Sequence, residues 1–147
     1  PDPAVGPDGG VVAVPTVIAP RPGPDDGWFW DAVRQGQLLL RQCGSCGRLQ
    51  HPPTPLCPAC GSATWTTRPA SGRGTVYAWL LSRHPTEPDA APRIVVLVEL
   101  AEGVRLVSNL VETAPDEVRN DMAVEACFVD YDGVVLPQFR PARARGR

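Results

Sequence analysis

The stretch CGSCGRLQHPPTPLCPACG, residues Cys43–Gly61, decides the fold of this 147-residue chain. It holds two Cys-x-x-Cys pairs, Cys43/Cys46 and Cys57/Cys60, which stand ten residues apart and are each followed directly by a glycine. The tight turn within such a pair directs backbone N–H groups at the sulfurs, so each pair can bind one metal ion. Two pairs complete the tetrahedral four-sulfur shell of structural zinc and leave no position open for water or substrate. The spacing therefore predicts one closed zinc site, bound by these four cysteines, in a zinc ribbon.

Three alternatives to zinc stay open. Two disulfides need an oxidising compartment, and the sequence carries no signal-peptide pattern that would indicate secretion. A redox Cys-x-x-Cys is a single pair at the start of a helix, whereas two pairs are present here. Iron in a rubredoxin-type site shares its ligands and geometry with zinc and is disfavoured only because it is less frequent. His51 lies between the pairs, but four cysteines already fill the shell, so we expect it at the surface or beside the ligands.

The chain divides into four segments by composition. Residues 1–24 hold seven prolines and four glycines, which is typical of a linker, although Val11–Pro20 is apolar enough for an arm that docks on a partner. Residues 25–70 are predicted to form a helix followed by the zinc ribbon, and residues 71–141 are predicted to form an OB-fold. Residues 142–147 (ARARGR) are basic and are predicted to be disordered.

A short helix is predicted just before the ribbon, in DGWFWDAVRQG (26–36). An aspartate suits its N-cap, and Gly36 suits the left-handed position after its end. Trp28, Phe29 and Trp30 cover most of its circumference, which is more aromatic surface than so short a helix buries on its own. Two interpretations stay open: the three rings pack into the core, or they form part of an interface with a partner protein, where aromatic residues are enriched.

After Gly61 the apolar pattern changes to that of β-strands. Five strands are predicted, and a helical segment at Pro115–Asn120, opened by a capping box of Thr113 and Asp116, separates the third from the fourth. Asp132-Gly133 is a strong signal for a type I′ hairpin turn between the last two. Five strands and one helix in this order are typical of an OB-fold barrel, so the chain is predicted to be mainly β. The predicted strands are Thr75–Arg83, Arg93–Leu100, Val104–Glu112, Ala123–Asp130 and Val134–Phe139.

Composition and charge disfavour several function classes. The formal net charge is −2 and all 14 basic residues are arginine, which argues against the basic surface that nucleic-acid binders need. The sequence has no apolar run of about 18 residues that could span a membrane. No Ser/His/Asp set and no phosphate-binding loop accompany the two histidines, so no catalytic residue is predicted. Cys127 alternates with apolar neighbours, which indicates a small core residue and not a nucleophile. Five cysteines, four of them assigned to the metal, fit a reducing cytoplasm.

Five motifs in this order resemble the DUF35 family over about residues 25–141. They are the helix DGWFWDAVRQGQL (26–38), the cysteine stretch 43–61, the turn SGRGTVYAW (71–79), the strands VVLVELAEGVRLVSNLV (95–111) and the ending GVVLPQFRP (133–141). The resemblance implies a rubredoxin-like zinc ribbon joined to an acyl-CoA-associated OB-fold. It also implies that the four cysteines bind zinc and that this chain carries no catalytic residue.

The resemblance further implies a role beside another protein. Family members act as non-catalytic subunits of thiolase-fold and similar acyl-CoA enzymes. In actinobacterial sterol side-chain degradation, some are fused behind a MaoC-type hydratase domain and resemble the partner of a lipid-transfer-protein-type aldolase. That enzyme cleaves a steroid acyl-CoA to propionyl-CoA and a 17-keto steroid. The chain does not begin with methionine and has a Pro/Gly-rich start, which fit the C-terminal domain of such a fusion. Its exclusive use of arginine suits a GC-rich actinobacterium.

Three functional hypotheses follow. In the first, the chain is not an enzyme alone but supports the assembly of an aldolase complex and the passage of substrate in it, with the helix aromatics at the interface. The second is a nucleic-acid-binding module, since OB-folds commonly bind single strands. The third is a domain whose OB groove binds the CoA ester, with Arg83, His84 and Arg93 flanking one loop and contacting its phosphates. Solvated charges at the ends of that loop are the alternative explanation for these residues.

Overall fold

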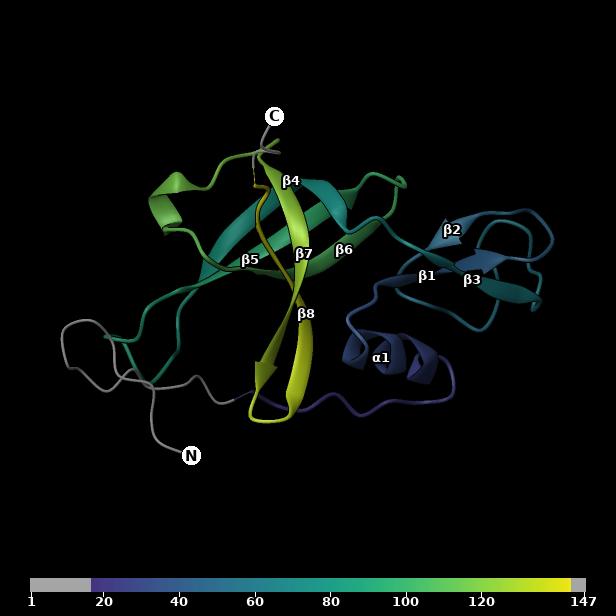
Figure 1. The fold of residues 1–147 in the computed structure, drawn as a ribbon, viewed down its shortest axis with the longest axis horizontal. Helices are drawn as coiled ribbons and strands as arrows, with labels where there is room; N and C mark the ends of the chain where they lie inside the picture. The colour runs from purple at the N-terminus through teal and green to yellow at the C-terminus, as the bar shows by residue number, and fades with distance from the viewer. Residues whose placement is uncertain (1–16, 144–147) are drawn as a thin grey trace.

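The computed structural model describes residues 17–143 and shows a mainly β protein (Figure 1). The proposed linker or arm at residues 1–24 and the proposed tail at 142–147 therefore lie mostly outside the described residues. A three-stranded sheet, a closed five-stranded barrel and one α-helix make up the described part. In chain order the elements are α1 (Gly27–Arg34), β1 (Leu39–Cys43), β2 (Leu49–Gln50), β3 (Trp65–Pro69), β4 (Arg73–Ser82), β5 (Arg93–Leu100), β6 (Arg105–Leu110), the 3₁₀ turn η1 (Pro115–Glu117), β7 (Ala123–Tyr131) and β8 (Val134–Pro141).

The barrel has the strand order β4-β5-β6-β8-β7 and closes where β7 pairs with β4. Neighbouring strands are antiparallel except β6 and β8, which are parallel at Leu110 and Phe139. With η1 between the third and fourth barrel strands, this is the topology of an OB-fold. The predicted fold class is confirmed.

The ends of α1 follow from its sequence. Asp26 is the N-cap residue, but its carboxylate accepts hydrogen bonds from the Gly23 N–H (2.6 Å) and the Trp30 indole (3.2 Å) instead of capping the helix. At the other end Gly36 has a φ of 72°, and the N–H groups of Gly36 and Gln37 donate to carbonyls of the last helical turn at 3.0 and 2.9 Å. This is a Schellman motif, and it explains why a glycine follows the helix.

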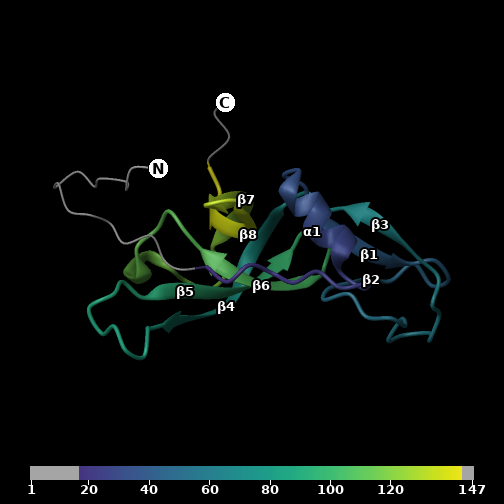
Figure 2. The same ribbon diagram turned by 90° about the horizontal axis from the view of Figure 1, so that it is seen from below.

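Ribbon, helix and barrel share one hydrophobic core. Figure 2 shows α1 lying between the ribbon sheet and the barrel. Leu38, just before β1, and Leu40, within it, are buried together with Phe29 and Val33 of α1. The ribbon therefore does not fold around a core of its own, because its apolar side chains complete that of the barrel. The buried members of this core are Phe29, Val33, Leu38, Leu40, Val76, Ile94, Val96, Val98, Leu100, Val104, Leu106, Leu110, Val118, Val124 and Phe139.

The third strand of the ribbon, β3 (Trp65–Pro69), was not among the predicted strands. All five of its residues are exposed, so its sequence has no alternation of apolar and polar side chains. It forms instead because its backbone pairs with β1 from Leu39 to Cys43. Backbone pairing, which carries no side-chain signal, completes the ribbon sheet.

The segment after β6 is helical for one 3₁₀ turn only, so the predicted helix over 115–120 is too long. The predicted capping by Asp116 is also wrong. The carboxylate of Glu117 accepts hydrogen bonds from the Thr113 hydroxyl (3.0 Å) and the Ala114 N–H (3.2 Å). Val118 is already extended and is buried in the core, which ends the turn.

The turn between β7 and β8 agrees with the sequence. Asp132 and Gly133 have φ angles of 53° and 91°, both positive as a type I′ turn requires. The Gly133 N–H also donates to the Asp130 carboxylate at 2.6 Å. The predicted hairpin is confirmed.

Candidate metal centre and other predicted sites

The two cysteine pairs are built in the same way. In each, the following glycine donates its N–H to the carbonyl of the first cysteine: Gly47 to Cys43 at 3.0 Å and Gly61 to Cys57 at 2.8 Å. The two glycines have φ angles of 74° and 75°. Because other residues rarely adopt this conformation, the glycine after each pair is a requirement of the turn.

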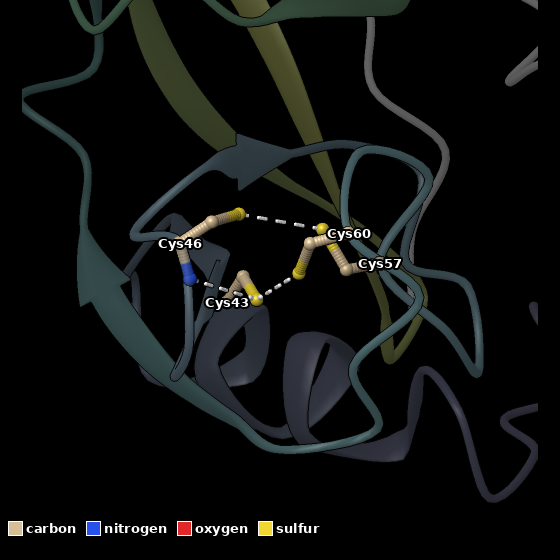
Figure 3. Close-up of side chains that lie close together, drawn as sticks. All are labelled: Cys43, Cys46, Cys57 and Cys60. Carbon is tan, nitrogen blue, oxygen red and sulfur yellow. Dashed lines mark hydrogen bonds between the residues drawn. The ribbon is translucent and has the colours of Figure 1, made fainter.

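The two turns bring the four sulfurs together (Figure 3). All four Sγ atoms lie within 4.8 Å of one another; the Cys43–Cys60 distance is 3.6 Å and the Cys46–Cys57 distance is 3.7 Å. Sulfurs at the corners of a tetrahedron around zinc, each at 2.3 Å, are about 3.8 Å apart, whereas a disulfide needs about 2.05 Å. The four cysteines are thus positioned to bind a metal ion and are not paired as disulfides.

The electrostatics of the cluster favour a bound cation. The N–H groups of Cys46 (3.5 Å) and Ser45 (3.4 Å) point at the Cys43 sulfur. They are the largest of the contacts that lower the pKa of the Cys43 thiol to about 6, and the Cys60 and Cys46 thiols act in the same direction. At Cys60 the N–H of Ser62 acts in the same direction, but the neighbouring thiols outweigh it and raise the pKa of Cys60 to about 11. Four thiolates so close together repel one another, and a divalent cation removes that repulsion.

Side chains outside the motif support the site. The Ser45 hydroxyl donates to the Ser62 hydroxyl at 2.8 Å and so links the two turns. Arg41 is only 3% exposed; its guanidinium lies 4.7 Å from the centre of the Trp65 ring and donates to the Pro55 carbonyl at 3.1 Å. Arg41 therefore ties β1 to the proline-rich loop between the cysteine pairs. Sequence reasoning missed this residue, because a single arginine in a strand carries no signal of burial.

His51 does not join the four-sulfur cluster. Its ring packs against Phe29, with the ring centres 5.2 Å apart, and burial lowers the pKa of His51. The Nδ1 atom is buried and makes no hydrogen bond to the described residues. His51 thus packs where the inter-pair loop meets α1, a place that was not expected from the sequence.

The three aromatic residues of α1 differ in exposure. Phe29 is 4% exposed and belongs to the core, so in this chain its ring is not a contact surface. Trp28 is half-buried beside Trp65, at 5.4 Å between ring centres, and Trp30 is half-buried beside Phe29 at 5.2 Å. A role in a partner interface stays a prediction for Trp28 and Trp30.

The three residues predicted to contact CoA flank the loop between β4 and β5, because Ser82, the last residue of β4, pairs with Arg93. Arg83 and His84 are exposed in the loop after β4. Arg93, also exposed, borders a cavity of about 610 Å³ lined by Ile94, Leu110 and other side chains of the barrel, and neither Arg83 nor His84 lines it. Only one of the three therefore lies beside an apolar space that could hold part of a ligand.

Cys127 is half-buried on β7. Burial raises the pKa of its thiol, with Arg140 acting weakly in the opposite direction, which suits a packed side chain better than a nucleophile.

None of the helices formed by residues 17–143 has the length and apolar character needed to cross a membrane.

Both the ribbon and the barrel match known protein families. Residues 30–66 match the family model described as "ChsH2, rubredoxin-like zinc ribbon domain", and residues 67–129 match "ChsH2, C-terminal OB-fold domain". A chain from a solved structure, described as "Ltp2-ChsH2(DUF35) aldolase", is 41% identical and superposes with a TM-score of 0.76, covering 83% of this chain and 98% of that one.

Three relatives add to this. A "probable enoyl-CoA hydratase alpha subunit" of Thermomonospora curvata is 42% identical over 87% of this chain, and the "3-oxo-4,17-pregnadiene-20-carboxyl-CoA hydratase alpha subunit" of Mycobacterium tuberculosis is 32% identical over 85%. The matches cover only 41% and 40% of those proteins, so the chain spans about two fifths of their length. A "DUF35 domain-containing scaffold protein" of Pyrococcus furiosus is 32% identical, over 77% of this chain and 90% of that protein.

Proposed function

Because this chain belongs to the DUF35 family, as a ChsH2-type zinc ribbon joined to an OB-fold, we propose that it is a non-catalytic subunit of an acyl-CoA aldolase complex. The observation that carries this proposal is the match to the chain from the Ltp2–ChsH2(DUF35) aldolase, which extends over 98% of that chain. In the proposal the catalytic subunit has a thiolase fold, and the present chain supports its assembly and the passage of substrate.

Zinc is the metal that we assign to the four cysteines, in a structural role. Sulfur distances of 3.6 and 3.7 Å suit a tetrahedral shell, and four protein ligands leave no coordination position for substrate. When bound, the ion supplies charge neutralisation and folding energy, not a chemical step. Metal analysis together with the visible spectrum separates zinc from rubredoxin-type iron, because only the iron site is coloured.

The reaction we assign to the complex is retro-aldol cleavage of a steroid side-chain CoA ester, releasing propionyl-CoA. Two observations support it: the name of the Mycobacterium tuberculosis relative contains a pregnadiene carboxyl-CoA, and the matching solved structure is described as an aldolase. Since both hydratase relatives are much longer than this chain, we place it beside a MaoC-type hydratase domain in its parent protein.

Co-expression tests this function. The chain is produced with an Ltp2-type aldolase encoded in the same genome, and the pair is passed over a size-exclusion column. We expect co-elution and an aldolase activity that falls sharply when this chain is left out. The Pyrococcus furiosus scaffold relative, which is 32% identical, serves as the control for specificity. Separate elution, with an activity indifferent to the chain, would contradict the proposal.

Direct binding of the acyl-CoA is a second candidate. The observation in its favour is the cavity of about 610 Å³ at the barrel mouth, with Arg93 on its border. A guanidinium there can meet a phosphate, while the apolar lining suits an acyl group. Arg93→Ala in the complex should raise KM several-fold if this is correct, whereas Arg34→Ala, on the exposed side of α1, should not. An unchanged KM for Arg93→Ala removes this candidate.

A further inference from the structure

Strand β4 is paired along only part of one edge. On one side it pairs with β5 from Gly74 to Ser82, but on the other it pairs with β7 only from Arg73 to Thr75. Val76 adds two backbone hydrogen bonds to the segment just before β7. In the described part of the chain, no backbone group pairs with this second edge beyond Val76. Figure 2 shows that the β4–β5 hairpin extends toward the end of the molecule opposite the zinc ribbon.

This unpaired stretch, Tyr77–Ser82, is apolar on both faces. Trp79 and Leu81 lie opposite Val96 and Ile94, which are buried inside the barrel, so they point to the same inner side. They are nevertheless both 37% exposed, since β7 pairs with β4 only from Arg73 to Thr75 and does not flank them. On the other face Leu80 is 56% exposed, and Tyr77, at the bulge in β4, is 48% exposed.

Within residues 17–143, most of the usual protections of a free edge are absent from this stretch. Soluble proteins block exposed edges with lysine, proline, inward charges or a covering segment, because unpaired N–H and C=O groups otherwise recruit another strand. From Thr75 to Ser82 the sequence TVYAWLLS contains no charged residue and no proline. The one protection present is the bulge between Val76 and Ala78, at the start of the free stretch; from Ala78 to Ser82 the register with β5 is continuous. Such an edge is suited to be covered by another chain.

We propose that the free edge of β4, Tyr77–Ser82, is the surface on which the aldolase subunit docks by adding an extended segment to the barrel. This rests on the proposed function. An edge whose own side chains are apolar and uncharged favours an extended backbone with apolar side chains, while Arg105 beside Tyr77 and Arg83 after Ser82 place positive charge only at its two ends. Main-chain hydrogen bonds then supply affinity, and Trp79, Leu80 and Leu81 supply the apolar contacts that aromatic and aliphatic anchors make in interfaces.

The size of the surface agrees with such a partner. Every residue from Tyr77 to Asp89 is exposed, which makes thirteen consecutive residues in the strand and the loop at its tip. A standard protein interface uses about 20–30 residues on each side, so the hairpin alone supplies roughly half of one. Val107, 69% exposed on the outer face of β6, extends it across the sheet, since Val107 pairs with Leu97 and Leu97 with Ala78.

The test is Leu80→Lys in the full chain, with Leu56→Lys as the matched control. The two leucines are equally exposed, at 56%, but Leu56 lies in the ribbon loop. Affinity for the Ltp2-type aldolase is measured by titration, and zinc content and thermal unfolding verify the fold. We expect Leu80→Lys to weaken binding about tenfold or more, as loss of an interface anchor does. Leu56→Lys should stay within about twofold. Leu80→Thr, which keeps strand propensity, takes its place if the lysine variant does not fold.

The outcomes separate the two proposals. If the wild-type chain binds the aldolase and Leu80→Lys binds equally well, the docking surface is wrong and the proposed function stands. If the wild-type chain does not bind the aldolase, both are wrong. If the chain alone forms dimers that Leu80→Lys dissociates, while aldolase binding is unchanged, a second copy occupies the edge and the proposal is overturned.

Discussion

Replacing Phe29 with alanine should unfold the junction between the ribbon and the barrel more readily than any change at the surface. Phe29 is 4% exposed, and its ring packs edge-on against Trp30 at 5.2 Å and Trp28 at 6.1 Å. His51 contacts the same ring at 5.2 Å. Phe29 is therefore the side chain through which α1 joins the inter-pair loop to the shared core.

The magnitude follows from this burial. Removing a buried phenylalanine ring forfeits about 1.5–3 kcal/mol of transfer free energy, and the cavity that it leaves raises the cost of Phe→Ala to about 3–5 kcal/mol. The edge-to-face contacts place Phe29→Ala in the upper part of that range. In a chain of this size each kcal/mol lowers the midpoint of thermal unfolding by about 2–4 °C, so a cost of about 4–5 kcal/mol lowers it by roughly 8–20 °C. Phe29→Leu, which fills part of the space, should lose about half as much.

Urea unfolding of the zinc-loaded protein, followed by tryptophan fluorescence and circular dichroism, measures this loss. Tyr77→Ala is the control, because Tyr77 is also aromatic but is 48% exposed, and it contacts Arg105, whose guanidinium lies 3.7 Å from the ring centre. It should cost about 1 kcal/mol or less. If Phe29→Ala lowers the free energy of unfolding no more than Tyr77→Ala does, α1 does not anchor the ribbon through this ring. The interpretation that ribbon and barrel share one core would then be wrong.

Three further predictions concern the metal, the pH and the barrel. Removing the metal with a strong chelator should unfold the ribbon, because residues 39–69 bury too little apolar surface to fold alone. Amide hydrogen exchange in these residues should then accelerate. Unchanged exchange rates would contradict this prediction. Burial lowers the folded-state pKa of His51 below its unfolded value of about 6.5, so the unfolded state binds more protons in acid. The contribution of His51 to stability should therefore be constant above about pH 7 and fall as the pH drops below the unfolded pKa. His51→Phe should remove that part of the pH dependence in urea titrations while His84→Gln keeps it, and identical profiles for the two variants would contradict the assignment. Gly74→Ala should destabilise the protein by several kcal/mol, because the added Cβ would lie 2.5 Å from the Glu99 carbonyl oxygen of β5. The control is Gly27→Ala, whose added Cβ meets nothing within 4 Å and which should be neutral or stabilising in thermal melts. Equal melting temperatures for the two variants would show that β5 can move away from the added methyl group.

The elements that were predictable are those whose signal is local. The strand β5 (Arg93–Leu100) was predicted to the residue, because RIVVLVEL is a short apolar run bounded by a proline-rich loop and a hairpin connection. The Asp132-Gly133 turn was predictable because few residues other than glycine and its usual partners accept two positive φ angles in succession. The grouping of four cysteines followed in the same way from spacing, since each pair and its glycine form one closed turn.

What could not be predicted depends on tertiary contacts. No pattern in Trp65–Pro69 reveals that its backbone pairs with β1. Arg41 looks like a surface residue until the Trp65 ring and the Pro55 carbonyl are placed around it. The helix aromatics could each have faced the core or solvent, and only the position of the barrel decides that Phe29 is buried. Each of these residues is placed by a partner distant in the sequence.

The metal centre and the free edge of β4 lie at opposite ends of the molecule, yet the core connects them (Figure 2). Leu40, fully buried in β1, belongs to the same hydrophobic cluster as Val76 of β4. We therefore expect loss of the metal to destabilise the barrel by loosening the packing of this shared core. A ribbon defect should therefore weaken partner binding in proportion to the loss of folded protein. A change at the edge of β4 should weaken binding without a loss of folding. The two kinds of effect are distinguished by a plot of aldolase affinity against the free energy of unfolding, made for cysteine variants and for Leu80→Lys. The cysteine variants should fall on one line, and Leu80→Lys should bind more weakly than that line predicts. If all the variants share one line, the ribbon and the edge act through stability alone and the edge is not a contact surface.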